Sequence, residues 1–254
     1  MYEAGAAIDS GLDDAIYLGG SNYTCHDAIA QIGIPEFEFP RSDFPRGFRF
    51  AGIVPPSIPT AVPEFPWWNK LILNSQRRLE ERARVVVVAQ GTVEMDPAQL
   101  ILPTLRLLAN RQDVLTVAIL GSRSARLPEG IKLPHNACIA NYLPYDAVLP
   151  LADLWVHNGG YGATMHGIAH GVPMVIAGDG QDKPENGKRV QYSGLGIDLA
   201  TAHPNAEQLG IAINAVLSGE AFSKVARSMQ RTFRQMDCFT NIEEIINNEI
   251  ACSA

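Results

Sequence analysis

The chain has no excess of positive charge and no long apolar run. Its 20 Lys and Arg residues are outnumbered by 27 Asp and Glu residues, which gives a formal net charge of −7. This balance argues against a nucleic-acid-binding surface. It leaves room for an anionic small ligand, because a helix N-terminus can bind phosphate without net positive charge. No apolar run approaches the ~20 residues that a transmembrane helix needs, so no membrane span is expected.

The first 20 residues lack the basic cluster of a secretory signal and contain Glu3, Asp9, Asp13 and Asp14. Cysteine is scarce as well, and none of the four has the spacing of metal ligands: Cys25, Cys138, Cys238 and Cys252. We interpret them as free thiols in a reducing compartment. The sequence therefore predicts a cytoplasmic protein without a metal site.

The composition and the placement of proline divide the chain into three zones. The 254 residues are 46% hydrophobic, which is enough for one sizeable core and a second small one. Residues 1–50 are mixed. Residues 51–83 begin with a dense run of prolines that disfavours regular structure and is typical of a semi-rigid linker. From Arg84 the pattern is regular, so residues 84–254 are predicted to form the main domain.

Short apolar runs alternate with helical patterns after Arg84. The predicted strands are Val85–Ala89, Leu115–Leu120, Cys138–Asn141, Leu154–His157, Met174–Ala177 and Gly196–Leu199. Helices are expected from Asp96-Pro97, with Asp96 as N-cap and Gln99 reaching back, and over Ala163–His170, Pro184–Tyr192 and Ala206–Leu217, the last capped by Asn205. Two further helices follow. This alternation predicts an α/β fold with a doubly wound parallel sheet.

The stretch Asn158–Thr164 carries three glycines between a predicted strand and a predicted helix. Glycine lets the backbone turn sharply and lets a phosphate approach the main chain. A tight turn without any ligand explains the same glycines, and both interpretations stay open at this point. The chain has neither G-x-G-x-x-G nor G-x-x-x-x-G-K-[ST], so neither a dinucleotide-dependent dehydrogenase nor a P-loop NTPase is indicated.

Several motifs in order resemble one known family. The run NGGYGATMHGIAHGVPM from Asn158 to Met174, followed by Asp182–Asn186, resembles the nucleotide-sugar signature of the UDP-glycosyltransferases, the family 1 glycosyltransferases. Upstream, Tyr142–Tyr145 resembles the Trp-x-Pro-Gln of that family, and Gln90-Gly91-Thr92 resembles its first Gly-Thr turn. The resemblance covers roughly residues 35–250. It implies the two-domain GT-B fold and an inverting transfer of a hexose from a UDP-sugar to an acceptor hydroxyl, with the nucleotide sugar as co-substrate and no other cofactor.

The resemblance also implies roles for individual residues. The ring of Tyr142 would stack on the nucleobase, and the main chain at Leu143 would bond the edge of the base. His166 stands where the family has a Glu that binds the ribose hydroxyls, and Asp182 and Lys183 would bond the sugar. The diphosphate would be held by Gly91, Thr92, Asn158, Gly160, Gly162, Ala163 and Thr164. Alternatives remain open: Tyr142 could face the core, Asp182 could serve only as a helix N-terminal charge, and Thr92 could be a plain turn hydroxyl.

The sequence departs from the family pattern in four places. Asn158 replaces the diphosphate-binding His, His166 replaces the Glu, and Lys183 replaces the Gln of an Asp-Gln pair. The fourth departure is that only about 50 residues precede the linker, where the family has an acceptor domain with the catalytic base. His26 is the sole histidine there and its surroundings do not resemble the catalytic loop, so no catalytic residue is assigned.

These departures leave three hypotheses for the chain. The first is a donor-binding half that needs an acceptor domain from a partner chain or a homodimer, with residues 1–50 as a remnant of that domain. The second is a catalytically inactive nucleotide-sugar-binding or degenerate truncated protein. The third is a GT-B epimerase that acts on a nucleotide sugar. Binding of UDP would separate a functional donor site from a relic.

Overall fold

The computed structural model describes residues 26–57, 64–91 and 96–253 and divides the chain into two units. The smaller unit consists of Met1–Pro35, Pro40–Val54 and Gln235–Ala254, and the larger one of Glu36–Phe39 and Pro55–Arg234. Neither unit is one continuous stretch of chain. The boundaries predicted from the sequence, with domains over 1–50 and 84–254, stay a prediction.

The smaller unit combines two short strands with the last helix of the chain. Strand β1 (Ile29–Ile32) pairs in parallel with β2 (Phe48–Gly52), and α10 (Cys238–Ser253) contacts both. The side-chain amide of Asn241 donates to the carbonyl of Ala51 at 2.9 Å and so ties the helix to β2. A cluster of three aromatic rings adds apolar packing in this unit: Phe44, Phe48 and Phe50.

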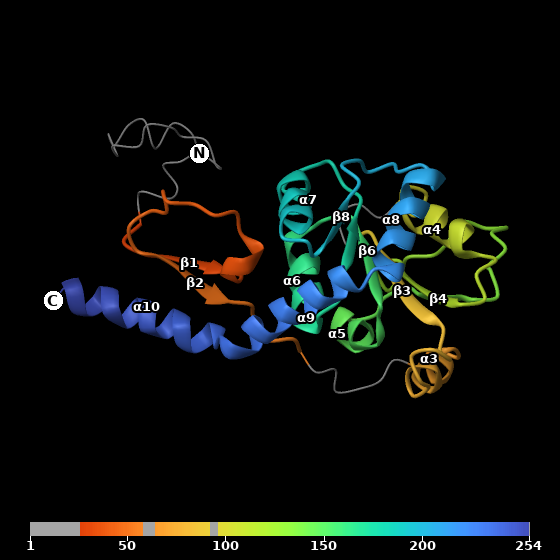
Figure 1. The fold of residues 1–254 in the computed structure, drawn as a ribbon, viewed down its shortest axis with the longest axis horizontal. Helices are drawn as coiled ribbons and strands as arrows, with labels where there is room; N and C mark the ends of the chain where they lie inside the picture. Colours follow the sequence, from red (N-terminus) through yellow and green to blue (C-terminus); the bar gives the residue numbers. More distant parts are fainter. Residues whose placement is uncertain (1–25, 58–63, 92–95, 254) are drawn as a thin grey trace. The chain divides into compact units, whose positions relative to one another are not determined.

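The larger unit is built on one parallel sheet, which among the described residues has six strands. They are β3 (Arg84–Ala89), β4 (Val114–Ile119), β5 (Ala137–Ala140), β6 (Leu154–His157), β7 (Met174–Ile176) and β8 (Gly196–Asp198). Their spatial order is β5-β4-β3-β6-β7-β8, and every pair is parallel. The chain thus builds the sheet outward from β3 in one direction and then outward from β6 in the other (Figure 1). The predicted doubly wound parallel sheet is confirmed.

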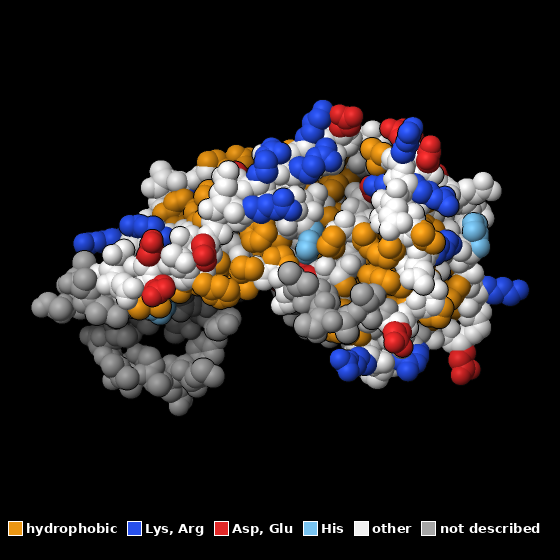
Figure 2. Space-filling view, turned by 90° about the horizontal axis from the view of Figure 1, so that it is seen from below, with side chains coloured by type: hydrophobic (Ala, Val, Ile, Leu, Met, Phe, Trp, Pro, Cys, Tyr) orange, Lys and Arg blue, Asp and Glu red, His pale blue; other side chains and the backbone are white. Residues whose placement is uncertain are grey.

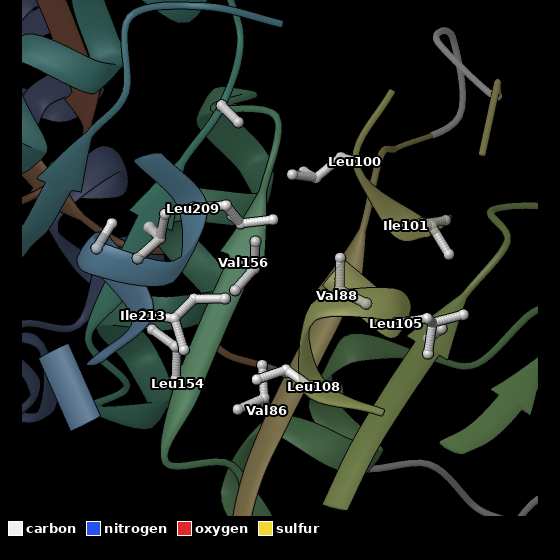
Figure 3. Packing of buried hydrophobic residues seen from close by; sticks show 14 of the residues in the cluster. Val86, Val88, Leu100, Ile101, Leu105, Leu108, Leu154, Val156, Leu209 and Ile213 are labelled. Carbon is white, nitrogen blue, oxygen red and sulfur yellow. The ribbon is translucent and has the colours of Figure 1, made fainter. Parts of the chain in front are cut away.

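Helices cover both faces of this sheet, which explains why its strands are mostly apolar. On one face, α4 (Ile101–Leu108) and α8 (Ala206–Ser218) pack on Val86 and Val88 of β3 and on Leu154 and Val156 of β6 (Figure 3). On the other face, α6 (Tyr161–His170) packs against Trp155, whose indole N–H donates to the carbonyl of Ala163 at 3.2 Å. This unit also contains α5 (Tyr145–Val148), η2 (Leu149–Leu151), α7 (Lys183–Tyr192) and nearly all of α9 (Glu220–Gln235).

The start of α4 corrects one expectation. Asp96 does not cap the helix; it accepts a bond from the N–H of Ala98 within a turn, and the helix begins later, at Ile101. The cap comes from outside, because the side-chain oxygen of Gln90 accepts from the N–H groups of Leu100 and Ile101. Pro103 lies in the first turn, where no intrahelical N–H bond is lost, so it does not break the helix. At α8, by contrast, Asn205 caps as predicted, and Gln208 completes a capping box.

Part of the predicted linker is regular structure. The described residues between Val54 and Trp67 form no helix or strand, but α3 (Trp68–Ser75) begins directly after the last proline, Pro66. The indole N–H of Trp67 donates to the carbonyl of Ile139 at 3.1 Å. Since β5 is an edge strand, this bond covers an otherwise open edge. The proline-rich segment is therefore fastened to the larger unit at this end.

A short N-terminal segment, Glu36–Phe39, belongs to the larger unit. The segment includes the last two residues of the 3₁₀ helix η1 (Pro35–Phe37), and the side chain of Phe37 is buried. Glu38 forms an ion pair with Arg189 of α7 at 2.8 Å, and the guanidinium of Arg189 lies 5.0 Å from the ring centre of Phe39. These contacts join residues about 150 positions apart in the sequence.

The described surface carries both kinds of charge. On the face shown in Figure 2, basic and acidic side chains are interspersed, with apolar side chains between them. Among the described residues, no single helix is long and apolar enough to span a membrane. The bent pair Ala206–Ser218 and Glu220–Gln235, which meets at 69°, passes that test only when its two helices are taken together.

Leu209→Ala should destabilise the larger unit, because Leu209 is fully buried between α8 and the sheet. We expect a loss of about 2–5 kcal/mol in the free energy of unfolding. Ile211 lies on the same helix with 64% of its surface exposed, so Ile211→Ala should change stability by less than about 0.5 kcal/mol. Urea unfolding followed by tryptophan fluorescence measures both, since Trp67, Trp68 and Trp155 all lie in this unit. Equal losses in the two variants would contradict the described packing.

Candidate functional site

The candidate site lies where the order of the strands reverses. Strands β3 and β6 are neighbours, yet the chain leaves them toward opposite sides of the sheet. In open parallel sheets, this switch point leaves a crevice at the carboxyl ends of the strands, where ligands bind. Gly91 follows β3 and Asn158 follows β6 at this edge. Two predicted donor-binding residues are thus brought together although they are far apart in sequence.

Asn158 connects the two strand ends directly. Its side-chain amide donates to the main-chain carbonyl of Gln90, and the side chain is almost fully buried. A Cβ atom placed on Gly91 would lie 3.6 Å from the Asn158 amide nitrogen, so Gly91 and Asn158 are in close proximity. Asn158, which was predicted to bind the diphosphate, is therefore also a structural residue that joins the two strand ends.

His157, one position earlier, points in the opposite direction. It is fully buried on the face of the sheet under α6, where its ring stacks on Trp155 with centroids 5.1 Å apart. Its Nδ1 accepts from the N–H of Gly159 at 3.1 Å, which requires an unprotonated nitrogen. Burial lowers the pKa of His157 to about 3, so the ring is neutral at physiological pH. His157 therefore helps to fix the conformation of the turn that contains Gly159 and Gly160.

Two glycines allow the loops at this edge to touch. A Cβ on Gly121, after β4, would overlap the carbonyl oxygen of Gly91, and a Cβ on Gly178, after β7, would overlap the carbonyl oxygen of Asn158. Any other residue at these positions would push the loops apart. The ends of β4, β3, β6 and β7 therefore form one continuous surface.

The N-terminus of α6 opens onto this surface. Gly160 is the N-cap residue, and Gly162 and Ala163 lie in the first turn. A Cβ on Gly162 would meet no atom within 4 Å, so space remains above the helix end. Thr164 is different: it is fully buried and its hydroxyl donates to the carbonyl of Gly160 at 3.1 Å. A ligand could reach that hydroxyl only after this bond breaks, and its predicted role stays a prediction.

Asp182 and Lys183 come to the same helix end from α7. The carboxylate of Asp182 accepts from the N–H of Tyr161 at 3.4 Å and from the amide of Asn186 at 2.8 Å. The negative charge is thus placed where the dipole of α6 favours it. The stem of Lys183 is buried beside Gly178, and its ammonium group bonds the side chain of Gln181 at 3.3 Å.

A pocket of about 340 Å³ continues the surface beyond β4. It is lined by Ser57, Ile119, Gly121, Tyr142, Leu143, Pro144, Tyr145, Asp146 and His166. Tyr142 is 45% exposed, so it does not face the core, and the guanidinium of Arg123 lies 5.8 Å from its ring centre. Leu143 has a buried side chain. Tyr142, Leu143 and His166 therefore line one cavity, and Gly121 of the same cavity lies against Gly91.

A buried carboxylate that the sequence interpretation missed lies in the wall of this pocket. One oxygen of Asp146 accepts from Nδ1 of His166 at 2.7 Å and from Nε2 of His170 at 2.9 Å. The other oxygen accepts from the main-chain N–H of Ser57 at 2.9 Å. His166 and His170 are four residues apart on α6, so the spacing alone places them on one helix face. Their carboxylate comes from another helix, which no local pattern indicates.

Two further predictions concern residues outside this surface. Thr92, expected at the diphosphate, lies outside the described residues. Within the described part of the chain, no group of three His, Cys, Asp or Glu side chains is arranged to hold a metal ion. Cys138 and Cys238 are buried free thiols, and burial raises the pKa of each.

Comparison with known proteins places this arrangement among glycosyltransferases. A family profile described as erythromycin biosynthesis protein CIII-like, C-terminal domain, matches residues 106–248. UDP-glucosyltransferase 1 of Beauveria bassiana is 39% identical over 88% of this chain and 47% of its own length. UDP-glucosyltransferase A1 of Starmerella bombicola is 36% identical over 94% of this chain and 50% of its own length. The chain spans about half the length of the curated relatives it matches.

Solved structures show the same fold. Spinosyn rhamnosyltransferase SpnG, complexed with thymidine diphosphate, superimposes with a TM-score of 0.67 at 24% identity, over 83% of this chain and 54% of that one. Spinosyn forosaminyltransferase SpnP gives a TM-score of 0.68 at 18% identity, over 87% and 55% of the two chains. These similarities confirm the predicted Rossmann-like half of a GT-B fold.

His157 should make the stability of the larger unit depend on pH. Its pKa is near 6.5 in the unfolded chain and about 3 in the folded one, so between these values the unfolded chain binds one more proton. The free energy of unfolding should therefore fall as the pH drops through this window. From pH 7.5 to 5 we expect the natural chain to lose about 2 kcal/mol more than His157→Gln. Parallel pH profiles in urea unfolding would show that His157 titrates normally.

Proposed function

The chain belongs to the family described as erythromycin biosynthesis protein CIII-like, C-terminal domain, and on this premise we propose that it holds the donor site of a glycosyltransferase. The donor is a nucleoside diphosphate hexose, most simply a UDP-sugar as for the named relatives. The nucleotide sugar is a co-substrate, and no metal or organic cofactor is required. The reaction is an inverting transfer to an acceptor hydroxyl.

One observation carries the proposal: Tyr142 and His166 line one pocket, and Gly121 of the same pocket lies against Gly91, which is next to Asn158. An elongated ligand with a flat base, a pentose and a diphosphate fits such a surface. The base would stack on Tyr142, and the main chain at Leu143 would bond its edge. A structural neighbour of the same fold is complexed with thymidine diphosphate, which supports a nucleoside diphosphate here.

The diphosphate would lie over the first turn of α6. Main-chain N–H groups near Gly160, Gly162 and Ala163, together with Gly91 and the amide of Asn158, would hold it, and the helix dipole favours its charge. The sugar would then extend toward Asp182 and Lys183. Since Asp182 now accepts from the N–H of Tyr161, donor binding would shift its carboxylate from that N–H to the sugar hydroxyls.

In the proposed reaction, this half of the enzyme binds and stabilises the leaving group, the nucleoside diphosphate. In an inverting transfer the acceptor oxygen attacks the anomeric carbon from the face opposite the diphosphate. The bond from that carbon to the diphosphate oxygen breaks, and its electrons remain on the oxygen. The N–H groups at α6 stabilise the growing charge. A general base must take the acceptor proton, and we assign none among the described residues of the larger unit.

The acceptor pocket and the base would come from an acceptor-binding half. That half could be another part of a longer polypeptide, a partner chain or a second copy of this chain. A chain that binds the nucleotide and never transfers a sugar is the alternative, favoured by Asn158, which lacks the charge of the His in the family pattern. Binding and turnover experiments separate the two.

Tyr142→Ala should weaken the binding of UDP about tenfold, because one base–aromatic stacking contact contributes about 1–3 kcal/mol. Tyr142→Phe keeps the ring and should bind like the natural chain. Isothermal titration calorimetry measures the affinity of each variant for UDP. NAD and ATP, which other Rossmann-like proteins bind, serve as comparison ligands. If NAD binds and UDP does not, the donor site is assigned to the wrong ligand.

The chain alone should hydrolyse a UDP-sugar slowly at most and should transfer little or no sugar. A positioned general base contributes on the order of 10²–10⁴ in rate, and this half supplies none. Mixing the chain with the N-terminal half of a full-length relative should restore transfer, measured by chromatography of the glycosylated acceptor. His26→Ala is the control and should change neither rate. If the chain alone transfers sugar robustly and His26→Ala abolishes this transfer, the proposal that the general base comes from a separate acceptor-binding half is refuted.

A further inference from the structure

The hydrogen bonds of Asp146 fix the state of His166. A carboxylate accepts hydrogen bonds and donates none, so the proton of each contact lies on the imidazole nitrogen. For His166 this nitrogen is Nδ1, 2.7 Å from the carboxylate. In a neutral ring, Nε2 then carries a lone pair and acts as an acceptor. Asp146 thereby selects one tautomer of His166.

His166 offers this lone pair to the pocket. Its side chain is 39% exposed and lines the cavity, whereas that of His170, the other imidazole on Asp146, is only 14% exposed. Among the described residues, no protein group bonds Nε2 of His166. Asp146 itself is 7% exposed, and both of its oxygens are engaged by the protein. The pocket wall therefore presents one acceptor here, while the carboxylate behind it stays inaccessible.

We propose that Asp146 is a positioning residue that fixes His166 as a single hydrogen-bond acceptor for the pentose of the bound nucleotide. The inference rests on the proposed function. One lone pair can accept from one hydroxyl at a time, and the 2′ and 3′ hydroxyls lie on adjacent carbons. Either hydroxyl then satisfies His166, so the site recognises one member of the pair and does not require both. A carboxylate at this position, with two oxygens, would bond both.

This single-acceptor arrangement has a signature in ligand series. Calorimetry on the full chain should compare UDP with its 2′-deoxy, 3′-deoxy and 2′,3′-dideoxy analogues. Each monodeoxy analogue should bind within about threefold of UDP, because the other hydroxyl takes over. The dideoxy analogue should bind about five- to tenfold more weakly, as expected for the loss of one hydrogen bond. A monodeoxy analogue that loses as much as the dideoxy one overturns the inference.

Variants of His166 and Asp146 test the roles separately. His166→Ala should bind all four nucleotides alike, at the affinity of the dideoxy analogue for the natural chain. In an Asp146→Asn background, adding His166→Glu should give a site that bonds both hydroxyls. Both monodeoxy analogues should then bind more weakly than UDP. Asp146→Asn alone is the matched control for that pair. If His166→Ala retains the natural pattern, His166 does not contact the pentose.

A spectroscopic readout distinguishes positioning from a purely structural role. The ¹⁵N chemical shifts of His166 should report the Nδ1–H tautomer in the natural chain and a mixture of tautomers in Asp146→Asn. Unchanged shifts in that variant overturn the role of Asp146. Should the Asp146 variants fail to fold, the four-nucleotide series on the natural chain still decides. Absence of UDP binding refutes the proposed donor site together with the inference, whereas UDP binding with monodeoxy losses refutes the inference alone.

Discussion

The hydrogen bond from the Asn158 amide to the Gln90 carbonyl holds together the place where the two halves of the larger sheet meet. Gln90 directly follows β3 and caps α4 with its side chain, and Asn158 directly follows β6 and leads into α6. The chain diverges from these two strands in opposite directions, which leaves a crevice at their carboxyl ends. The bond thus links the residue that caps α4 to the residue that leads into α6, just beyond the ladder that joins β3 and β6.

Glycines near this bond let the neighbouring loops pass close to the two strand ends. Once the strand ends are held this close, the neighbouring loops can pass only if they carry no Cβ, as at Gly121 and Gly178. Gly121 also lines the pocket after β4, so this pocket lies directly beside Gly91.

Much of the fold could be predicted because it depends on local sequence patterns. The bounds of β6 and the capping of α8 by Asn205 follow from an apolar run and from the chemistry of one side chain. The start of α4 was predicted wrongly because its cap, Gln90, comes from a neighbouring strand end. Asp146 was missed for the same reason, since its two histidines lie 20 and 24 residues away. The roles of the donor-site residues remain predictions from family resemblance.

The segment Glu36–Phe39 has a consequence for how such proteins can be recombined. It is separated in sequence from the rest of the larger unit by residues that belong to the smaller one, and yet Phe37 is buried, with its ring 6.4 Å from that of Tyr161, the first residue of α6. Consider a chimera of two relatives with its junction at the proline-rich segment. It would take this peptide from one parent and the α6 surface that the peptide packs against from the other. Incompatibility would then arise at the N-terminus of α6, where we propose that the donor binds, far from the junction in sequence. The functional module is discontinuous, and exchange between homologues should respect its spatial boundary rather than its linear one.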